Sequence, residues 1–253
     1  MNDKFTILTS SYNCGKYLKD WSKSVLAQKY RPLEIIFVND KSTDRTANII
    51  SKLATVLLDD DIDIKILTNE KRRYCGTSYN KALSFATGKY FGVLDADDSL
   101  KKESVQYICD LYQKYPEISW IYTQFSICNM SLKHKKRGWC KAPPKGKSLL
   151  SLKEQHAFSH WRTFSDRIER KDKIFKKGLR CAIDKYMGYR LEEMGKGMFA
   201  SRVCYRYRQR YSCSISTSEK TKSTWSKIRK EAAKRRKLYS YNVYPIMTYK
   251  DNK

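Results

Sequence analysis

The chain has 253 residues and a formal net charge of +26, since it holds 52 Lys and Arg against 26 Asp and Glu. Apolar residues make up 41% of the chain, which is enough to build a core and excludes wholesale disorder despite the high charge. Two positive charges for each negative one favour a polyanionic partner, which leaves nucleic acid, an anionic membrane and phosphate-bearing substrates open.

The cysteines and the N-terminal residues bear on the location of the protein. None of the 8 cysteines form a C-x-x-C pair and only 3 histidines are present, which argues against a structural zinc site. The first residues lack the apolar segment of a secretory signal, and no run approaches the ~20 apolar residues of a membrane helix. We therefore expect a cytoplasmic protein whose cysteines are free and mostly buried.

Short apolar runs alternate with amphipathic stretches over residues 1–100. Strands are predicted at residues 5–9, 34–38, 62–66 and 90–94, and helices at residues 16–28, 42–57 and 78–86. This alternation predicts an α/β fold built from βαβ units, with a mostly parallel sheet flanked by helices. Ligands of such sheets bind off the carboxyl ends of the strands. Here those ends carry a polar, acidic rim: Ser10, Ser11, Asp40, Asn69 and Asp95.

The rest of the chain is strongly basic. Residues 1–100 hold 15 Lys and Arg and 13 Asp and Glu, a net charge of +2, so +24 falls on residues 101–253. We predict helices at 101–115 and 184–193, strands at 120–127 and 203–208, and a basic loop at 133–147. A basic helix over Thr224–Leu238 would carry Trp225, Ile228 and Ala232 along one side.

The sharpest local feature is Asp95-Ala96-Asp97-Asp98, which follows a predicted strand. Three carboxylates in four residues repel one another, and oxygen-rich clusters of this kind hold Mg²⁺ or Mn²⁺. The alternative is an acidic turn in which Asp98 caps the next helix. Asp40 has a similar choice, between hydrogen bonds to a nucleotide and helix capping shared with Ser42 and Asp44.

Several of these motifs resemble, in order and spacing, the start of a family 2 glycosyltransferase. The resemblance is dense over residues 5–100 and rests on the runs 9–18, 34–44, 86–90 and 94–98, with Gln28, Asn69, Gly76 and Asn80 between them. It implies a GT-A fold, a Rossmann-like nucleotide-binding α/β sheet, and a divalent cation, Mn²⁺ or Mg²⁺. It further implies a nucleoside-diphosphate sugar as donor and inversion at the transferred carbon.

Carried over by position, the resemblance implies a nucleotide pocket formed by Ser10, Ser11, Tyr12, Asp40, Asn69, Arg72, Arg73 and Asp95. Within that pocket Tyr12 and Asp40 would contact the base, and Asp95 the ribose side. Asp97 would hold the metal, with Asp98 as a further member. Arg72 or Arg73 would neutralise the diphosphate, and the alternative for each is a solvated loop charge.

The second half resembles the family in fewer places. His160-Trp161-Arg162-Thr163-Phe164 is similar to a run of some members, and Asp184 stands in a segment similar to the one that holds the catalytic base. An inverting transfer needs one carboxylate to take the proton of the acceptor hydroxyl, and we assign this role to Asp184. Glu192 or Glu193 is the second choice for the catalytic base, although adjacent glutamates are more commonly charges on the surface of a helix.

Four basic or titratable residues complete the candidate set. His160 could reach the diphosphate or the metal, although a histidine beside Trp161 is more often a packed residue. Arg162, Arg208 and Arg210 are candidates for diphosphate or acceptor contacts. Arg210 stands where relatives of this kind have a histidine, and an arginine there would pair with phosphate.

These inferences divide the chain into a nucleotide-sugar half at 1–100, an acceptor and catalytic-base half of the same domain at 101–221, and a basic C-terminal helix and tail at 222–253. The leading hypothesis is transfer of a sugar from a UDP-sugar to a hydroxyl of a glycan or lipid-linked glycan. A nucleic-acid-binding protein and an inactive, membrane-associated relative are the alternatives. The excess of basic residues has three possible roles. Residues 133–147 and 170–180 would receive an acidic acceptor, or the 224–238 helix would dock on anionic lipid, or the charges would simply face solvent.

Overall fold

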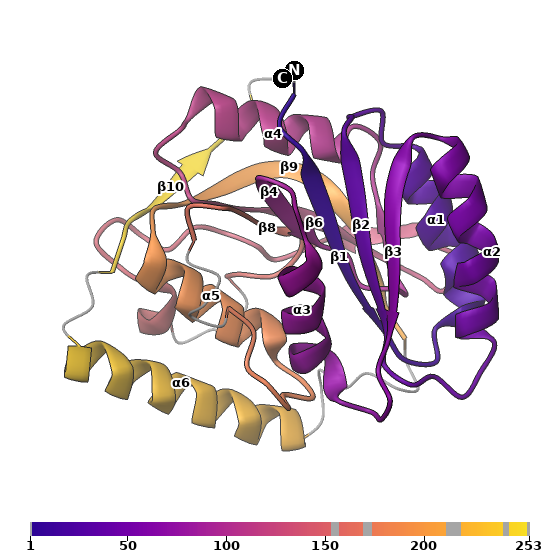
Figure 1. The fold of residues 1–253 in the computed structure, drawn as a ribbon. Coiled ribbons are helices and arrows are strands. Elements are labelled where there is room, and N and C mark those ends of the chain that lie inside the picture. Colours follow the sequence, from indigo (N-terminus) through magenta and orange to yellow (C-terminus); the bar gives the residue numbers. More distant parts are fainter. Residues whose placement is uncertain (1, 153–156, 169–173, 211–218, 240–242, 252–253) are drawn as a thin grey trace.

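The computed structural model describes residues 2–152, 157–168, 174–210, 219–239 and 243–251, in which the strands gather into a single sheet (Figure 1). The strands are β1 (Phe5–Ser11), β2 (Leu33–Asn39), β3 (Ile62–Thr68), β4 (Tyr90–Val93), β5 (Ser99–Leu100), β6 (Trp120–Cys128), β7 (His134–Arg137), β8 (Arg162–Ser165), β9 (Gly197–Arg208) and β10 (Ile246–Tyr249). Their order is β10-β9-β6-β8-β4-β1-β2-β3, with β5 paired to β9 and β7 to β6.

The helices alternate with the strands along the first half of the chain. They are α1 (Leu18–Leu26), α2 (Thr46–Asp59), α3 (Tyr74–Phe85), α4 (Ser104–Lys114), α5 (Ile183–Met194) and α6 (Glu219–Tyr239), with short 3₁₀ turns η1 (Gly15–Tyr17) and η2 (Leu149–Ser151). α1 and α2 lie on one side of β1–β3, and α3 lies on the other (Figure 1). The mostly parallel α/β sheet flanked by helices is confirmed.

The register of the sheet explains why the predicted rim residues meet. β1, β2 and β3 are parallel and end level with one another, because Ser11 pairs with Asn39 and Asn39 with Thr68. The next residue of each strand is therefore delivered to the same edge of the sheet. β4 ends three residues earlier, with Val93 opposite Leu8, so the chain reaches Asp95 at that edge too.

An antiparallel strand, β8, connects the two halves. It lies between β4 and β6 and pairs Arg162 with both Val93 and Tyr122. This pairing places Arg162 at the strand end that leads to Asp95. β6 runs parallel to β9, so the basic second half continues the same sheet, and β10 extends it beyond β9.

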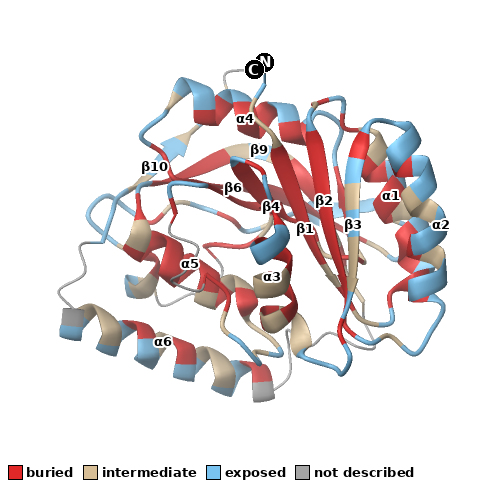
Figure 2. Ribbon diagram, viewed as in Figure 1, coloured by how far each residue is buried: buried red, intermediate tan, exposed pale blue. Residues whose placement is uncertain are grey.

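The core is largest where the two faces of the sheet are covered by helices, as the red strands and inward helix faces of Figure 2 show. Trp21, Trp120 and Trp161 are fully buried in it. Of the described cysteines, five are buried and two half-buried, and all seven are free, as expected. In the described part of the chain, no helix has the length and apolar character needed to span a lipid bilayer.

Some sequence predictions were wrong in detail. The expected loop at 133–147 contains β7, whose four residues are all exposed and charged or polar, so no alternating pattern marked it. α3 begins four residues before the predicted Ser78. Glu192 and Glu193, expected on a helix surface, have side chains that are 0% exposed, because they form ion pairs with Arg235 and Arg236 of α6.

Candidate functional site

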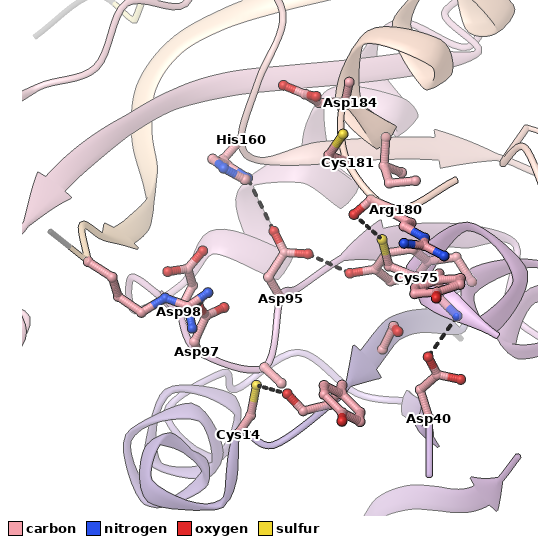
Figure 3. A pocket seen from close by; sticks show the side chains of 18 of the residues that line it. Cys14, Asp40, Cys75, Asp95, Asp97, Asp98, His160, Arg180, Cys181 and Asp184 are labelled. Carbon is pink, nitrogen blue, oxygen red and sulfur yellow. Dashed lines mark hydrogen bonds and ion pairs between the residues drawn. The ribbon is translucent and has the colours of Figure 1, made fainter. Parts of the chain in front are cut away.

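A pocket of about 660 Å³ opens at the carboxyl ends of β1, β2 and β4 (Figure 3). Of the residues predicted from the sequence, the pocket brings together Ser10, Tyr12, Asp40, Arg72, Asp95, Asp97, Asp98, His160, Arg162, Asp184, Arg208 and Arg210. They come from the strand ends of the first half, from β8, from the start of α5 and from the end of β9. Residues more than 170 positions apart in the chain therefore share one site.

Three predicted residues do not line the pocket. Ser11 is 1% exposed, and its hydroxyl oxygen has no hydrogen-bond partner in the described residues. Asn69 donates from Nδ2 to Asp40 Oδ1 at 2.7 Å and to Ser78 at 3.1 Å. Arg73 contributes its backbone N–H to the same Asp40 oxygen at 2.7 Å. Asn69 and the Arg73 backbone therefore hold the carboxylate of Asp40, which does line the pocket, in place.

Asp40 caps a helix, although this helix is α3 and not the predicted α2, and its contact with a nucleotide stays a prediction. Its carboxylate accepts backbone hydrogen bonds from Arg73 and Tyr74 at 2.7 Å each, which satisfies donors at the N-terminus of α3. The capping of α2 falls instead to Asp44, which accepts from the Thr46 N–H at 2.9 Å. Asp40 is only 2% exposed but still lines the pocket, so a ligand would meet a carboxylate of fixed orientation.

Alternating cations and aromatic rings line the pocket beside Asp40. The Arg72 guanidinium lies 3.7 Å from the centre of the Tyr12 ring and 5.1 Å from that of Tyr74, and Arg180 lies 4.2 Å from the Tyr74 ring. The loop that carries Arg180 packs tightly on α3, because a Cβ at Gly76 would stand 2.1 Å from the Lys176 carbonyl oxygen. Two flat rings with two guanidinium groups suit a base and the phosphates next to it.

Asp95 is bound by side chains on several sides. It accepts hydrogen bonds from the Tyr79 hydroxyl at 2.5 Å and from Arg162 Nη2 at 2.9 Å, and His160 Nδ1 lies 3.8 Å away (Figure 3). Burial alone would raise the pKa of Asp95, but the Arg162 guanidinium, with His160 and Tyr79, holds it below its ordinary value. Asp95 is therefore a carboxylate anion within the site.

Asp98 and Asp97 differ in their surroundings. Asp98 is 1% exposed and accepts from the Tyr205 hydroxyl at 2.8 Å and the Arg208 backbone N–H at 2.7 Å. Burial, together with the charges of Asp97 and Asp95, raises its pKa well above the ordinary value. Asp97 points to Arg210, whose Nη2 is 2.8 Å from Oδ2, and burial outweighs this partner so that the pKa of Asp97 is also raised.

Arg208 is held by the protein on several sides. Its Nε donates to the Asp97 carbonyl at 2.7 Å, Nη1 donates to the Met130 carbonyl, and Nη2 forms an ion pair with Asp20 at 2.8 Å. Its side chain is 3% exposed. Arg208 therefore fixes the turn that carries the carboxylates, whereas Arg210, with 35% of its side chain exposed, is the more accessible cation.

Asp95, Asp98 and His160 could hold a metal ion, because one ligand atom of each lies within 4.8 Å of the others. His160 Nδ1 is buried without a hydrogen-bond partner among the described residues. Burial and the Arg162 charge lower the pKa of His160 to about 4, so the imidazole is neutral and its ring nitrogen can bind a cation. Two carboxylates and one imidazole suit Mn²⁺ or Mg²⁺. The predicted ligand Asp97 lies outside this group, and its part in metal binding stays a prediction.

Asp184 faces the pocket from the opposite half of the fold. It lies in the first turn of α5 and lines the pocket, with no hydrogen bond or ion pair to its carboxylate among the described residues. A half-buried carboxylate without protein partners is available to a hydroxyl in the pocket. The fallback residues Glu192 and Glu193 do not line the pocket and are bound by arginines, so they are not candidates for this role.

Several lining residues were missed from the sequence. The Tyr79 hydroxyl donates to Asp95, and the Arg180 guanidinium lies over the Tyr74 ring. Thr221 and Trp225 line the pocket from α6. Arg180 lay in a basic stretch already assigned to the acceptor side. Tyr79 had no signal of its own, because its role depends on the packing of α3 over the end of β4.

The comparisons with known proteins bear on the family of this chain. The model of the glycosyl transferase family 2 matches residues 6–192. Chondroitin synthase of Pasteurella multocida is 26% identical over 94% of this chain, and hyaluronan synthase of the same species is 28% identical over 79%. The chain spans only 24% and 20% of those two relatives.

Solved structures share the fold. S. aureus TarS in complex with UDP-GlcNAc superposes with a TM-score of 0.74 at 18% identity, over 91% of this chain and 65% of that one. A mannosyltransferase of Pyrobaculum calidifontis in complex with GDP-Man and Mn²⁺ superposes with a TM-score of 0.60 at 16% identity, over 97% of this chain and 66% of that one. These likenesses show the GT-A type of fold.

Proposed function

Because the chain belongs to glycosyl transferase family 2, we propose that it transfers a sugar from a nucleoside-diphosphate sugar, a UDP-sugar, to a hydroxyl of a glycan acceptor. One observation carries the proposal: a single pocket is lined by Asp95, Asp98 and His160, which could hold a cation, and by Asp184, whose carboxylate has no hydrogen bond or ion pair among the described residues. The first group suits a diphosphate with its metal, and the second suits an acceptor hydroxyl.

The donor would lie along the carboxyl ends of β1, β2 and β4. Tyr12 and Asp40 would receive the base, the first by stacking and the second as a fixed hydrogen-bond acceptor. Arg72 and Arg180 would face the phosphates. A UDP-sugar is favoured over other donors because the superposed TarS structures hold UDP-GlcNAc and UDP.

A divalent cation, Mn²⁺ or Mg²⁺, would be held by Asp95, Asp98 and His160. When bound, it would offset the negative charge of the departing diphosphate. The neutral, unpartnered nitrogen of His160 supports this assignment, as does the Mn²⁺ in the mannosyltransferase structure. Arg162 and Tyr79 would keep Asp95 ionised and correctly oriented for that task.

Asp184 would act as the catalytic base. The acceptor oxygen attacks the sugar carbon from the side opposite the diphosphate, its O–H proton passes to Asp184, and the bond from that carbon to the phosphate oxygen breaks. This single displacement inverts the carbon. The proposed role is supported by the place of Asp184 in the lining of the same pocket as the residues that would hold the metal and the diphosphate.

The acceptor would be a glycan with acidic groups, free or linked to lipid. The curated relatives include chondroitin and hyaluronan synthases and a putative teichuronic acid glycosyltransferase, TuaG of Bacillus subtilis, whose names all refer to acidic polymers. The four residues of β7, His134–Arg137, are exposed and carry three formal positive charges beside the end of β6. Such a surface would attract a polyanionic chain, or an anionic membrane that holds it.

A donor-hydrolysis screen tests the proposal. UDP-, GDP- and dTDP-sugars are incubated with the protein and Mn²⁺, and release of the nucleoside diphosphate is followed. We expect release from at least one UDP-sugar and its loss in EDTA. Full activity in EDTA would refute the metal requirement, and exclusive hydrolysis of GDP- or dTDP-sugars would refute the UDP assignment.

A further inference from the structure

The C-terminal helix α6 extends one aromatic side chain into the pocket. Thr221, Trp225, Ile228 and Ala232 are spaced four, three and four residues apart, so they form one stripe along the helix. Ile228 and Ala232 are 2% and 0% exposed, whereas Trp225 is half-buried and lines the pocket together with Thr221. The stripe that packs α6 on the core thus continues into the site.

Buried ion pairs fix α6 in this position. Arg235 binds Glu193 of α5 through two hydrogen bonds of 2.8 and 2.9 Å, and Arg236 binds Glu192 at 2.8 Å. Both carboxylates have side chains that are 0% exposed, so these contacts are shielded from water. α6 lies along α5 in Figure 1, and the place of Trp225 beside the pocket follows from this docking.

Trp225 lies at the Asp184 end of the pocket. The Nζ of Lys185, the residue after Asp184, is 5.8 Å from the centre of the Trp225 ring. Ala182 and Ile183 line the pocket in the same region, so this end has an apolar wall next to one carboxylate. The lining also includes the three carboxylates Asp95, Asp97 and Asp98, so the pocket combines an apolar wall beside Trp225 with a strongly charged group.

A sugar ring has the chemistry that this end requires. Its axial C–H bonds form an apolar face, and its rim carries hydroxyl groups. A large, flat and rigid indole packs against such a face, and the nearby carboxylate can accept from a hydroxyl. A phosphate, which has no apolar face, would gain little from the apolar wall and would be repelled by Asp184.

We propose that Trp225 and the first turn of α5 form the subsite for the terminal sugar of the acceptor. The apolar face of that sugar stacks on the Trp225 indole while one hydroxyl reaches Asp184. The inference rests on the proposed function, because an acceptor subsite presupposes transfer. It specifies a saccharide, in preference to a lipid phosphate or a simple alcohol, as the group that receives the donor sugar.

The test compares wild-type protein with Trp225→Ala, Trp225→Phe and the control Leu238→Ala, which removes an apolar side chain that is 64% exposed on the same helix. Thermal unfolding verifies that all four proteins are folded. With UDP and Mn²⁺ present, saturation-transfer-difference NMR is recorded with methyl N-acetyl-β-glucosaminide, methyl β-glucuronide and glycerol 3-phosphate.

We expect saturation of the ring protons of at least one glycoside, strongest on its apolar face. Trp225→Ala should weaken this binding about tenfold, the size expected of one aromatic stacking contact, while Trp225→Phe and Leu238→Ala should stay within about twofold of wild type. Equal glycoside binding by wild type and Trp225→Ala, stronger binding of glycerol 3-phosphate than of both glycosides, or no glycoside binding by wild type would each overturn the subsite. UDP affinity, measured by calorimetry, separates the hypotheses: normal UDP binding with these results removes the subsite alone, whereas no UDP binding by wild type contradicts the proposed function.

Discussion

The carboxylate of Asp97 forms an ion pair with Arg210, with 2.8 Å between Oδ2 and Nη2. The sequence led us to expect Asp97 as the metal ligand and Arg210 as a phosphate ligand. The structure joins the two residues, while the group that could hold a metal ion is Asp95, Asp98 and His160. Arg210 and a metal ion are therefore competitors for Asp97 if Asp97 takes part in metal binding.

This competition makes Arg210→Met informative. If Asp97 is a metal ligand, removing the guanidinium should raise Mn²⁺ affinity about two- to fivefold, because a partly exposed ion pair contributes up to about 1 kcal/mol. Mn²⁺ titration by calorimetry in the absence of nucleotide measures the effect. Arg206→Met, at an exposed position of β9 four residues before Arg210, is the control. An unchanged Mn²⁺ affinity in Arg210→Met would show that Asp97 is not a ligand of Mn²⁺ in the nucleotide-free protein.

His160→Phe tests the other side of the cation site. The His160 ring stacks on Tyr205 at 4.6 Å and on Tyr207 at 5.2 Å between centroids, and phenylalanine preserves this packing while removing Nδ1. We expect a folded protein whose Mn²⁺ affinity falls at least about tenfold, since even the loss of an outer-shell partner costs 10–100-fold. The same titration would count against His160 as a ligand if the affinity of this variant matched that of wild type.

Glu193→Gln should lower the free energy of unfolding and not act directly on the transfer reaction. The buried Glu193 carboxylate accepts from Arg190, Arg235 and Arg236 at 2.8–3.1 Å, so its neutralisation leaves three guanidinium groups with a weaker partner. Breaking a buried pair costs about 3–5 kcal/mol of unfolding free energy. Denaturant unfolding measures it, with Glu231→Gln as the matched control, because the Glu231–Lys176 pair is 45% and 39% exposed. Equal stabilities of the two variants would show that the Glu193 network does not hold α6.

The exposed strand β7 should matter only for charged acceptors. Lys133→Glu, one residue before β7, combined with Lys136→Glu within it reverses charge at two exposed positions. We expect a higher KM for uronic-acid oligosaccharides, which converges on the wild-type value at high salt. Neutral oligosaccharides should be unaffected. The control is Lys29→Glu combined with Lys52→Glu, which makes the same change of charge away from the pocket. Lys29 lies in the loop after α1, and Lys52 lies on α2. An equal rise in KM for both double variants would mean that net charge, and not this surface, attracts the acceptor.

The nucleotide side of the site could be predicted from the sequence because its determinants are local. β1, β2 and β3 each end in a polar residue, and the parallel pairing of β1 with β2 and β4 brings Tyr12, Asp40 and Asp95 to the same edge of the sheet. The acidic motif at 95–98 was found for the same reason. The different contacts of Asp95, Asp97 and Asp98 could not be predicted, because the pairing of Asp97 with Arg210 depends on the path of β9.

The acceptor side depends on contacts between distant segments. β8 pairs antiparallel between two strands that precede it, and only this pairing brings Arg162 to Asp95. Glu192 and Glu193 form an adjacent pair typical of a helix surface, and their burial follows from two arginines that lie more than 40 residues later. Trp225 was placed correctly on the apolar stripe of α6, but the overlap of that stripe with the pocket was invisible without the docked helix.

Asp184→Asn is the variant on which the proposed chemistry depends. Asparagine keeps the size of the side chain and cannot take the acceptor proton, so transfer should fall about 10²–10⁴-fold while UDP binding is unchanged. The decisive measurement is UDP release from a UDP-sugar in the presence of Mn²⁺ and a saccharide acceptor, for wild type and Asp184→Asn, alongside their UDP affinities. The account predicts equal UDP affinity, acceptor-dependent release by wild type and almost none by the variant; near-normal turnover by Asp184→Asn would contradict it.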